Sequence, residues 1–351
     1  MKKEIRIGKH MIGEEHPCFC VAEMSGNHLQ DYSRAVEIIH AAKEAGADAV
    51  KLQTYTADSL SLDCDNEYFQ IHGGLWDGMT EYRLYQEAYT PWEWQPKLKE
   101  IAEKLGMECF SSPFDFSSVD FLEGCQMPAY KIASYEINDI PLIRKVARLH
   151  KPVIFATGVA HTEDIERALQ VCREEENDRV VLLKCVSAYP TPYEDINLKM
   201  IPTLARTYDC LVGLSDHSMG SVVPIGALPL GIHMVEKHLT LRRSDGGPDG
   251  AFSMEPEEFR EMVDGIRILE KALGSSEYHL TEKQEKERSG SRSLFVVNDV
   301  KAGEKLTPEN IRSIRPAAGL HTMYYEEVLG KTAARDLERG TPLAWDMIRK
   351  D

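Results

Sequence analysis

The sequence has no long apolar run. No uninterrupted hydrophobic stretch approaches the roughly 20 residues that a membrane-spanning helix needs. The basic start at Met1, Lys2 and Lys3 leads into no hydrophobic core of a signal peptide. We therefore expect a protein that stays in the cytoplasm and does not enter a membrane.

The sequence also lacks the CxxC pairs that are typical of structural zinc sites. Its eight cysteines are scattered through apolar runs. This distribution predicts reduced, mostly buried thiols in place of a disulfide framework.

Positive charge is scarce, because 41 lysines and arginines face 57 aspartates and glutamates and the net charge is −16. Nucleic acid or an anionic membrane would favour a broad basic surface, so neither is an expected partner. A small anionic substrate stays compatible with this balance, since a few lysines in one cleft can bind it. With 42% hydrophobic and 28% charged residues, the composition is that of a globular protein.

A strand-then-helix rhythm organises most of the chain. Residues 4–16 resemble a hairpin that would plug a barrel floor, and eight short apolar runs follow, each before an amphipathic stretch. The expected strands are 18–22, 49–53, 108–112, 129–133, 153–156, 180–185, 210–214 and 233–236. The expected helices include 33–45, 92–105, 141–149, 163–175, 221–230 and 256–273. Eight alternating units predict a (β/α)₈ TIM barrel, a fold of roughly 250 residues.

The 351-residue chain is long enough for a second, smaller module. We place the barrel in residues 1–274, a polar and charged linker in 275–292, and a small β-rich module in 293–351. Within the module, residues 307–311 are expected to form a short helix opened by a threonine cap and a proline.

Two histidines stand out between Val212 and Asp249. His217 and His238 are 21 residues apart, and each follows an apolar run, as side chains do at neighbouring strand ends of a barrel. Neutral imidazole binds divalent metals, and two ligands would leave coordination positions for a substrate. The alternative is two ordinary polar histidines.

Polar residues recur where the predicted strands end, the face that carries active sites in barrel enzymes. Three of them are the lysines Lys51, Lys131 and Lys184. Because an inward-facing lysine needs an anionic partner, they indicate a phosphate or carboxylate site. A single strand-end lysine is more often solvated.

One connection is too long for the rhythm. The loop at 54–91 has 38 residues, against about 2 to 6 in an ordinary barrel loop. It is rich in tyrosine and tryptophan, which suits a lid over a sugar-like ligand. A subdomain with its own small core or a subunit contact is an equally good explanation for most of these aromatics.

Motifs along the whole chain resemble one enzyme family. AEMSGNH (22–28), VKLQTY (50–55), SSPFD (111–115), YKIAS (130–134), KCVSAYPTPYED (184–195), GLSDHS (213–218), EKHLT (236–240) and GGPDGAFSM (246–254) are similar to the sialic acid synthases. SRSLFVVNDVKAGE (291–304) and IRPAAG (314–319) resemble their C-terminal antifreeze-like (SAF) domain. Within the family, LQTYTAD (52–58), GGLWDG (73–78) and YQEAYTPWEW (85–94) are similar to the pseudaminic acid synthase branch.

The resemblance implies condensation of phosphoenolpyruvate with the open-chain aldehyde of an N-acetylated amino sugar, giving a nine-carbon keto acid and phosphate. For the pseudaminic branch the acceptor is 2,4-diacetamido-2,4,6-trideoxy-L-altrose. An N-acetylneuraminate or legionaminate synthase, using another N-acetylated hexose, is the nearest alternative. A metal-dependent aldolase that starts from pyruvate and a non-catalytic sugar-binding protein are more distant ones.

The resemblance also implies roles for single residues. His217 and His238 would bind a divalent metal, Mn²⁺ in the first place and Mg²⁺ or Co²⁺ as alternatives. Glu23 would activate water or shuttle its proton, and Asp249 would hold the sugar or a metal-bound water. The substrate-binding residues would be Lys51, Gln53, Ser112, Lys131, Ser134, Ser187, Tyr189, Ser215 and Arg315.

Arg315 lies in the SAF-like module, which in the family covers the barrel mouth of the partner subunit, so a swapped homodimer is implied. Three positions depart from the family pattern. Ser112 stands where threonine is common, Ser187 where asparagine is common, and Ala156 in place of a phosphate-binding serine. Thr157 would compensate for Ala156 only if the strand end shifted.

Overall fold

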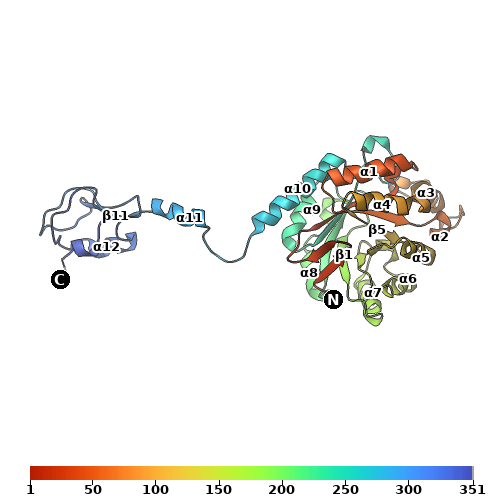
Figure 1. Ribbon diagram of the computed structural model, residues 1–351, viewed down its shortest axis with the longest axis horizontal. Helices are drawn as coiled ribbons and strands as arrows, with labels where there is room; N and C mark the ends of the chain where they lie inside the picture. Colours follow the sequence, from red (N-terminus) through yellow and green to blue (C-terminus); the bar gives the residue numbers. More distant parts are fainter. Residues whose placement is uncertain (350–351) are drawn as a thin grey trace. The chain divides into compact units, whose positions relative to one another are not determined.

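A computed structural model of the protein describes residues 1–349. The chain forms two compact units, the first spanning Met1–Gly274 and the second beginning at Ser275 (Figure 1). Among the described residues, no helix is both long and apolar enough to cross a membrane.

The first unit begins with a hairpin of β1 (Glu4–Ile7) and β2 (His10–Gly13), paired antiparallel. Ile5, Ile7 and Ile12 are buried in one cluster with the residues that open several barrel strands, such as Phe19 and Met234. The hairpin therefore closes the amino-terminal end of the barrel, as the sequence predicted.

Eight parallel strands form a closed barrel, in which β10 pairs with β3 and every other strand with its neighbour in sequence. The predicted barrel is confirmed, and each predicted strand overlaps an observed one. The strands are β3 (Phe19–Glu23), β4 (Ala49–Thr54), β5 (Glu108–Pro113), β6 (Tyr130–Ile132), β7 (Val153–Ala156), β8 (Val180–Cys185), β9 (Leu211–Asp216) and β10 (Met234–His238).

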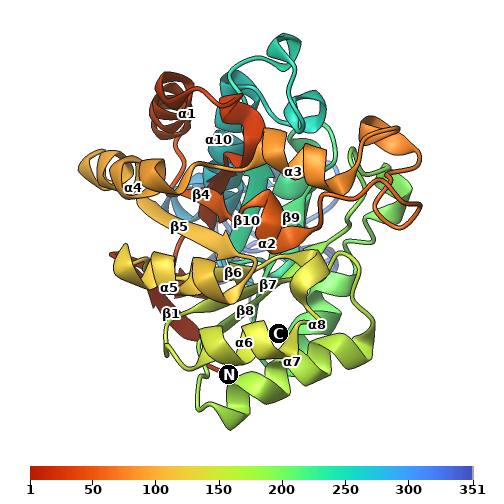
Figure 2. The same cartoon turned by 90° about the vertical axis from the view of Figure 1, so that its right-hand side faces the viewer.

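Helices surround the strands (Figure 2). Several begin where an aspartate accepts hydrogen bonds from the first free N–H groups, as Asp31 does from Ser33 at 2.8 Å. The barrel helices are α1 (Tyr32–Glu44), α4 (Gln95–Lys104), α5 (Phe116–Gly124), α6 (Ile140–Ala147), α7 (Thr162–Glu174), α8 (Met200–Tyr208), α9 (Val222–Ala227) and α10 (Pro256–Leu273).

Side chains alternate between two cores along each strand. In β8, Val181 and Leu183 belong to the cluster inside the barrel, whereas Val180 and Leu182 belong to the larger cluster between strands and helices. The period of two follows from the pleat of the strand. It decides which polar side chains at the strand ends reach the barrel mouth.

The long loop between β4 and α4 is folded. It contains α2 (Ala57–Leu60), a 3₁₀ turn at Gly74–Trp76, and α3 (Glu81–Ala88), whose Leu84 and Ala88 are buried. α3 packs against the turn at Ser25–His28 that follows β3. The insert thus lies at the carboxyl end of the barrel, against the turn that follows β3.

In the second unit, α11 (Glu282–Glu287) precedes the antiparallel pair β11 (Ser293–Val296) and β12 (Ile311–Ile314), with α12 (Tyr325–Val328) after it. The helix predicted at 307–311 is wrong. Thr307 and Asn310 close a single turn through a 3.1 Å backbone bond, and Ile311 already pairs with Val296. Thr307 and Pro308 therefore begin a single turn, and β12 starts directly after it.

Candidate active site

Two lysines and two glutamates meet inside the carboxyl end of the barrel. Lys51 forms an ion pair with Glu23, and Lys131 forms one with Glu236 at 2.5 Å. Lys51 also lies 3.8 Å from Glu236, so the four groups form one cluster. All four side chains are at most 6% exposed. Four charges buried together this completely have to be paired, since the loss of hydration is otherwise prohibitive.

The cluster shifts the pKa values of its members in different directions. Burial raises the pKa of Glu23, and Lys51 opposes it only in part. Burial also acts on Glu236, but Lys131 and Lys51 outweigh it and hold the pKa of Glu236 below its usual value. Glu23 and Glu236, on neighbouring strands, therefore have pKa values shifted in opposite directions. This pattern is typical of acid/base sites.

Lys184 does not join this cluster, and its predicted inward orientation is wrong. It lies between Leu183 and Cys185 in β8, and the period of two turns its side chain away from the barrel interior. Its ammonium group donates instead to the Cys185 carbonyl at 2.7 Å. Of the three predicted strand-end lysines, Lys51 and Lys131 therefore point inward.

Serines line the same space. Lys51 donates to Ser112 at 3.4 Å and Lys131 to Ser215 at 3.3 Å. Ser134 accepts a hydrogen bond from the Gly158 backbone at 3.1 Å, and the buried Ser187 hydroxyl has no protein partner among the described residues. The unpartnered Ser187 hydroxyl and the serines that accept from the two lysines provide polar groups for an anion.

Gly158 is required by this packing. A Cβ added there would lie 2.2 Å from the Ser187 hydroxyl oxygen and 2.7 Å from that of Ser134. Thr157 does not replace the hydroxyl that is missing at Ala156, because its own hydroxyl donates to the Leu183 carbonyl at 3.0 Å. The strand end is not shifted to expose it.

His217 and His238 come together at the ends of β9 and β10, with ring centroids 5.3 Å apart. His217 Nδ1 donates to the Val186 carbonyl at 2.9 Å, which leaves Nε2 with the lone pair when the ring is neutral. His238 Nδ1 is buried without a partner among the described residues. A buried ring nitrogen without a hydrogen bond, on an imidazole that packs against a second one, fits a pair of metal ligands.

The two histidines differ in basicity. Burial and then the neighbouring His217 lower the pKa of His238 well below its usual value, which keeps it neutral and able to bind a metal. Burial also disfavours charge on His217, but Cys185 raises its pKa above the ordinary value. Burial raises the pKa of Cys185, but His217, Lys131 and Ser134 together lower it to about 7.

No group of three or more His, Cys, Asp and Glu side chains within residues 1–349 is placed to share one ion. His217 and His238 are the two side chains here that could bind a divalent cation together. Water and substrate oxygens would complete its coordination.

An aromatic wall borders the histidines. Tyr189 packs against His217 at a centroid distance of 4.5 Å, Phe252 at 5.0 Å and Trp76 at 5.7 Å. Trp76 comes from the insert and donates its indole N–H to the Pro248 carbonyl at 2.9 Å. The insert thus reaches the mouth of the barrel. From its aromatic content alone, a lid at the mouth could not be distinguished from a separate subdomain.

Two further carboxyls lie at the mouth. Asp249 is buried and accepts hydrogen bonds from the Ser25 hydroxyl and, at 3.4 Å, from the Gly26 backbone; burial raises its pKa. Gln53 joins this group to Glu23, donating to Ser25 at 3.0 Å and to Glu23 at 3.1 Å.

Glu136 was not singled out from the sequence, because no motif or pattern around it indicates a functional residue. Burial raises its pKa to about 7, and its Oε2 has no partner within residues 1–349.

Arg315 lies in the second unit, at the end of β12, and is exposed. Within one chain it is the single predicted site residue outside the barrel.

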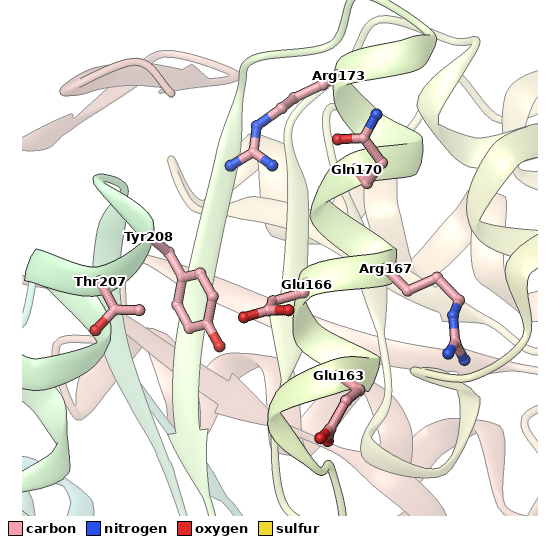
Figure 3. Close-up of a pocket in the computed structure, with 7 residues that line it drawn as sticks. All are labelled: Glu163, Glu166, Arg167, Gln170, Arg173, Thr207 and Tyr208. Atoms are coloured by element: carbon pink, nitrogen blue, oxygen red, sulfur yellow. The ribbon is translucent and has the colours of Figure 1, made fainter.

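A separate hollow of about 680 Å³ opens between α7 and α8 on the outside of the barrel (Figure 3). Glu166 and Tyr208 point toward each other there, and Arg173 lies farther along α7. It contains none of the predicted site residues and none of the paired lysines or histidines. Its surface of ordinary helix side chains gives no reason to place chemistry there.

Comparison with known proteins identifies relatives of this chain. The NeuB family model matches residues 38–278, and the SAF domain model matches residues 291–349. The chain is 46% identical over 325 residues to a pseudaminic acid synthase of Campylobacter jejuni, covering 93% of this chain and 95% of that protein. It is 34% identical to an N,N'-diacetyllegionaminic acid synthase of Legionella pneumophila, with 96% of each covered.

Among solved structures, the spore coat polysaccharide biosynthesis protein SpsE of Bacillus subtilis is similar over 99% of both chains. The TM-score is 0.68 and the sequence identity is 34%.

Proposed function

This chain belongs to the NeuB family, and from that we propose that it is a pseudaminic acid synthase: it condenses phosphoenolpyruvate with 2,4-diacetamido-2,4,6-trideoxy-L-altrose and releases phosphate by C–O cleavage. The observation that carries the proposal is the pairing of two buried lysines with two glutamates beside His217 and His238. A sugar-binding protein needs neither a buried charge cluster nor paired metal ligands.

Phosphoenolpyruvate would bind at Lys51 and Lys131, with Ser112, Ser134, Ser187, Tyr189 and Ser215 around it. The serine hydroxyls beside the two lysines suit an anion with many acceptor oxygens. When the substrate binds, its anionic groups would replace Glu23 and Glu236 as partners of the lysines, so both lysines would stay paired before and after binding.

His217 and His238 would hold the divalent cation, for which we propose Mn²⁺, with Mg²⁺ and Co²⁺ as alternatives. Such an ion polarises the aldehyde carbonyl and stabilises negative charge on its oxygen. Activity should disappear with EDTA and return with Mn²⁺. His217→Ala or His238→Ala should abolish the metal-dependent turnover, and retained turnover would overturn the assignment.

Glu23 would take up the proton of the water that adds to C2 of the former enol. Its raised pKa and its contact with Lys51 suit a group that accepts and returns a proton during turnover. Asp249, held by Ser25 beside Gln53, would orient a hydroxyl of the sugar or a metal-bound water.

The acceptor is the part of the proposal that needs its own test. Purified protein with Mn²⁺ and phosphoenolpyruvate would be given the altrose derivative, N-acetylmannosamine and a legionaminic acid precursor, and the products read by mass spectrometry. We expect the nine-carbon product from the altrose derivative at a kcat/KM at least tenfold above the others. Equal or better use of another sugar would overturn the specificity, and product formation from pyruvate would overturn the reaction class.

We also propose a swapped homodimer, in which Arg315 of one subunit presents its guanidinium to the acetamido oxygen of the sugar in the other. Arg315→Ala and His217→Ala chains, each inactive alone, should regain activity when co-refolded. Absence of recovery in verified heterodimers would contradict shared sites.

A further inference from the structure

Two charged residues that take no part in the proposed reaction lie directly behind the histidines. Asp216 and Lys237 are opposite each other in the β9–β10 ladder, and their side chains are 2% and 1% exposed. The Lys237 ammonium group is 2.9 Å from Asp216 Oδ2. Each residue immediately precedes a histidine in the sequence.

The hydrogen bonds of this pair enclose His217. Lys237 also donates to the backbone carbonyl of Ser218, and Ser218 donates its N–H (3.1 Å) and its hydroxyl (2.9 Å) to the Asp216 carboxylate. One ammonium group is thus bonded to both neighbours of His217, and it belongs to the residue before His238. The backbones that carry the two imidazoles are tied together at a single point.

The tie lies where backbone pairing ends. The ladder between β9 and β10 runs from Val235 and Leu214 to Lys237 and Asp216 and stops there. Beyond it, the relative positions of the histidines depend on other contacts. Alternation along the strands points Asp216 and Lys237 toward the helices and His217 and His238 toward the barrel mouth, so neither charged group is a ligand itself.

Stability alone does not explain this pair. It lies next to a core of aliphatic residues such as Leu214 and Val235, and well-packed apolar side chains at such positions are often as stabilising as a buried ion pair or more so. A buried charge pair differs from them in fixing one geometry.

We propose that the Asp216–Lys237 pair is a positioning device that holds His217 and His238 at the separation that one divalent cation requires. The inference rests on the proposed role of the histidines as metal ligands. It predicts that the pair tunes metal affinity without contacting the metal, as groups behind the ligands do in other metal sites.

The test measures Mn²⁺ binding to metal-free protein by calorimetry and by the electron paramagnetic resonance of free Mn²⁺. Lys237→Met and Asp216→Asn should weaken Mn²⁺ binding by about 10- to 100-fold. Ser218→Ala, which removes only the hydroxyl contact, should weaken it at least about threefold, and Lys237→Arg should retain most of the affinity. The resonance of bound Mn²⁺ should broaden in the weakened variants.

A matched control is the Arg267–Asp48 pair, 2.8 Å apart, in which Asp48 directly precedes β4 at the other end of the barrel. Asp48→Asn should lower the midpoint of thermal unfolding and leave the Kd for Mn²⁺ within twofold. If Lys237→Met behaves like this control, the pair serves stability and the positioning inference is wrong.

Two other outcomes separate the inference from its premise. If wild-type protein binds no Mn²⁺, or His217→Ala binds it equally well, the proposed metal site itself is wrong. If Lys237→Met fails to fold, Ser218→Ala decides the matter, and unchanged Mn²⁺ affinity in that variant would overturn the inference.

Discussion

Lys131 and Glu236 meet across the full width of the barrel. Their strands, β6 and β10, are four positions apart in the ring of eight, yet Nζ and Oε1 are 2.5 Å from each other. Together with the Lys51–Glu23 pair, this contact balances the charge of the site before any substrate binds. A multiply charged anion therefore has to compete with Glu236 for its lysines.

Glu236→Gln should separate substrate affinity from stability. Removing one negative charge leaves two buried ammonium groups with fewer partners, so the free energy of unfolding should fall by about 3 kcal/mol. The same change should tighten phosphoenolpyruvate binding at least about fivefold, since a competing carboxylate is gone. Denaturant unfolding and calorimetry without acceptor measure the two effects. Weaker phosphoenolpyruvate binding would show that Glu236 orients the lysines more than it competes with the anion.

Glu23→Gln should act on turnover and much less on binding. The amide keeps the size and the contact with Gln53 but cannot exchange a proton, so kcat should fall by about 10²- to 10⁴-fold. The KM for the acceptor sugar should change by less than about threefold. Steady-state kinetics with saturating Mn²⁺ check this.

The matched control is Glu108→Gln, at the start of β5. Glu108 is buried like Glu23 and accepts a 2.7 Å bond from the Lys9 backbone, but it lies at the opposite end of the barrel. This variant should lose stability and keep kcat. Equal loss of kcat in both variants would remove Glu23 from the chemistry.

The fold was predictable because the strands are visible in the sequence as short apolar runs. Short apolar runs such as 153–156 and 180–185, separated by amphipathic helices, match the observed strands to the residue. The pairing of charges was not predictable. Side chains alternate between the inside and the outside of the barrel, so a shift of one residue along the strand decides which way a lysine points. Lys51 and Lys131 point inward, and Lys184 points outward.

Contacts between distant segments were the second limit. Glu236 was visible at a strand end, but nothing in the sequence places it beside Lys131, 105 residues away. Trp76 was one aromatic among many in the insert until its hydrogen bond to Pro248 placed it at the mouth. Pairing of this kind is set by the closed ring of strands and by side-chain packing, which a local pattern does not encode.

Trp76→Phe should weaken acceptor binding and leave phosphoenolpyruvate binding unchanged. The substitution keeps a ring against Tyr189 but removes the hydrogen bond to the Pro248 carbonyl, next to Asp249. The KM for the sugar should rise about three- to tenfold, and Trp76→Ala should raise it further. Tyr68→Phe, in the exposed part of the same insert, is the control that should change neither KM. A rise in the KM for phosphoenolpyruvate alone would contradict a role at the acceptor side.

Glu136→Gln should stabilise the protein increasingly as the pH rises above about 5. Burial raises the pKa of Glu136 from 4.5 to about 7. Between these values the unfolded chain releases the proton while the folded protein keeps it, so this carboxyl lowers stability as pH rises, by about 2 to 3 kcal/mol in all. At pH 4.5 the carboxyl is protonated in the folded protein and only half ionised in the unfolded chain, so the penalty is small, and it vanishes at lower pH.

The glutamine variant removes that penalty because it never ionises. Its free energy of unfolding should therefore match the wild type near pH 4.5 and exceed it by about 2 kcal/mol at pH 8, the difference growing between pH 5 and 7. Urea unfolding at both pH values measures it, with Glu163→Gln on the exposed face of α7 as the control. A difference that is the same at pH 4.5 and pH 8 would mean that the substitution acts through packing, and that Glu136 is already ionised at little cost in the folded protein.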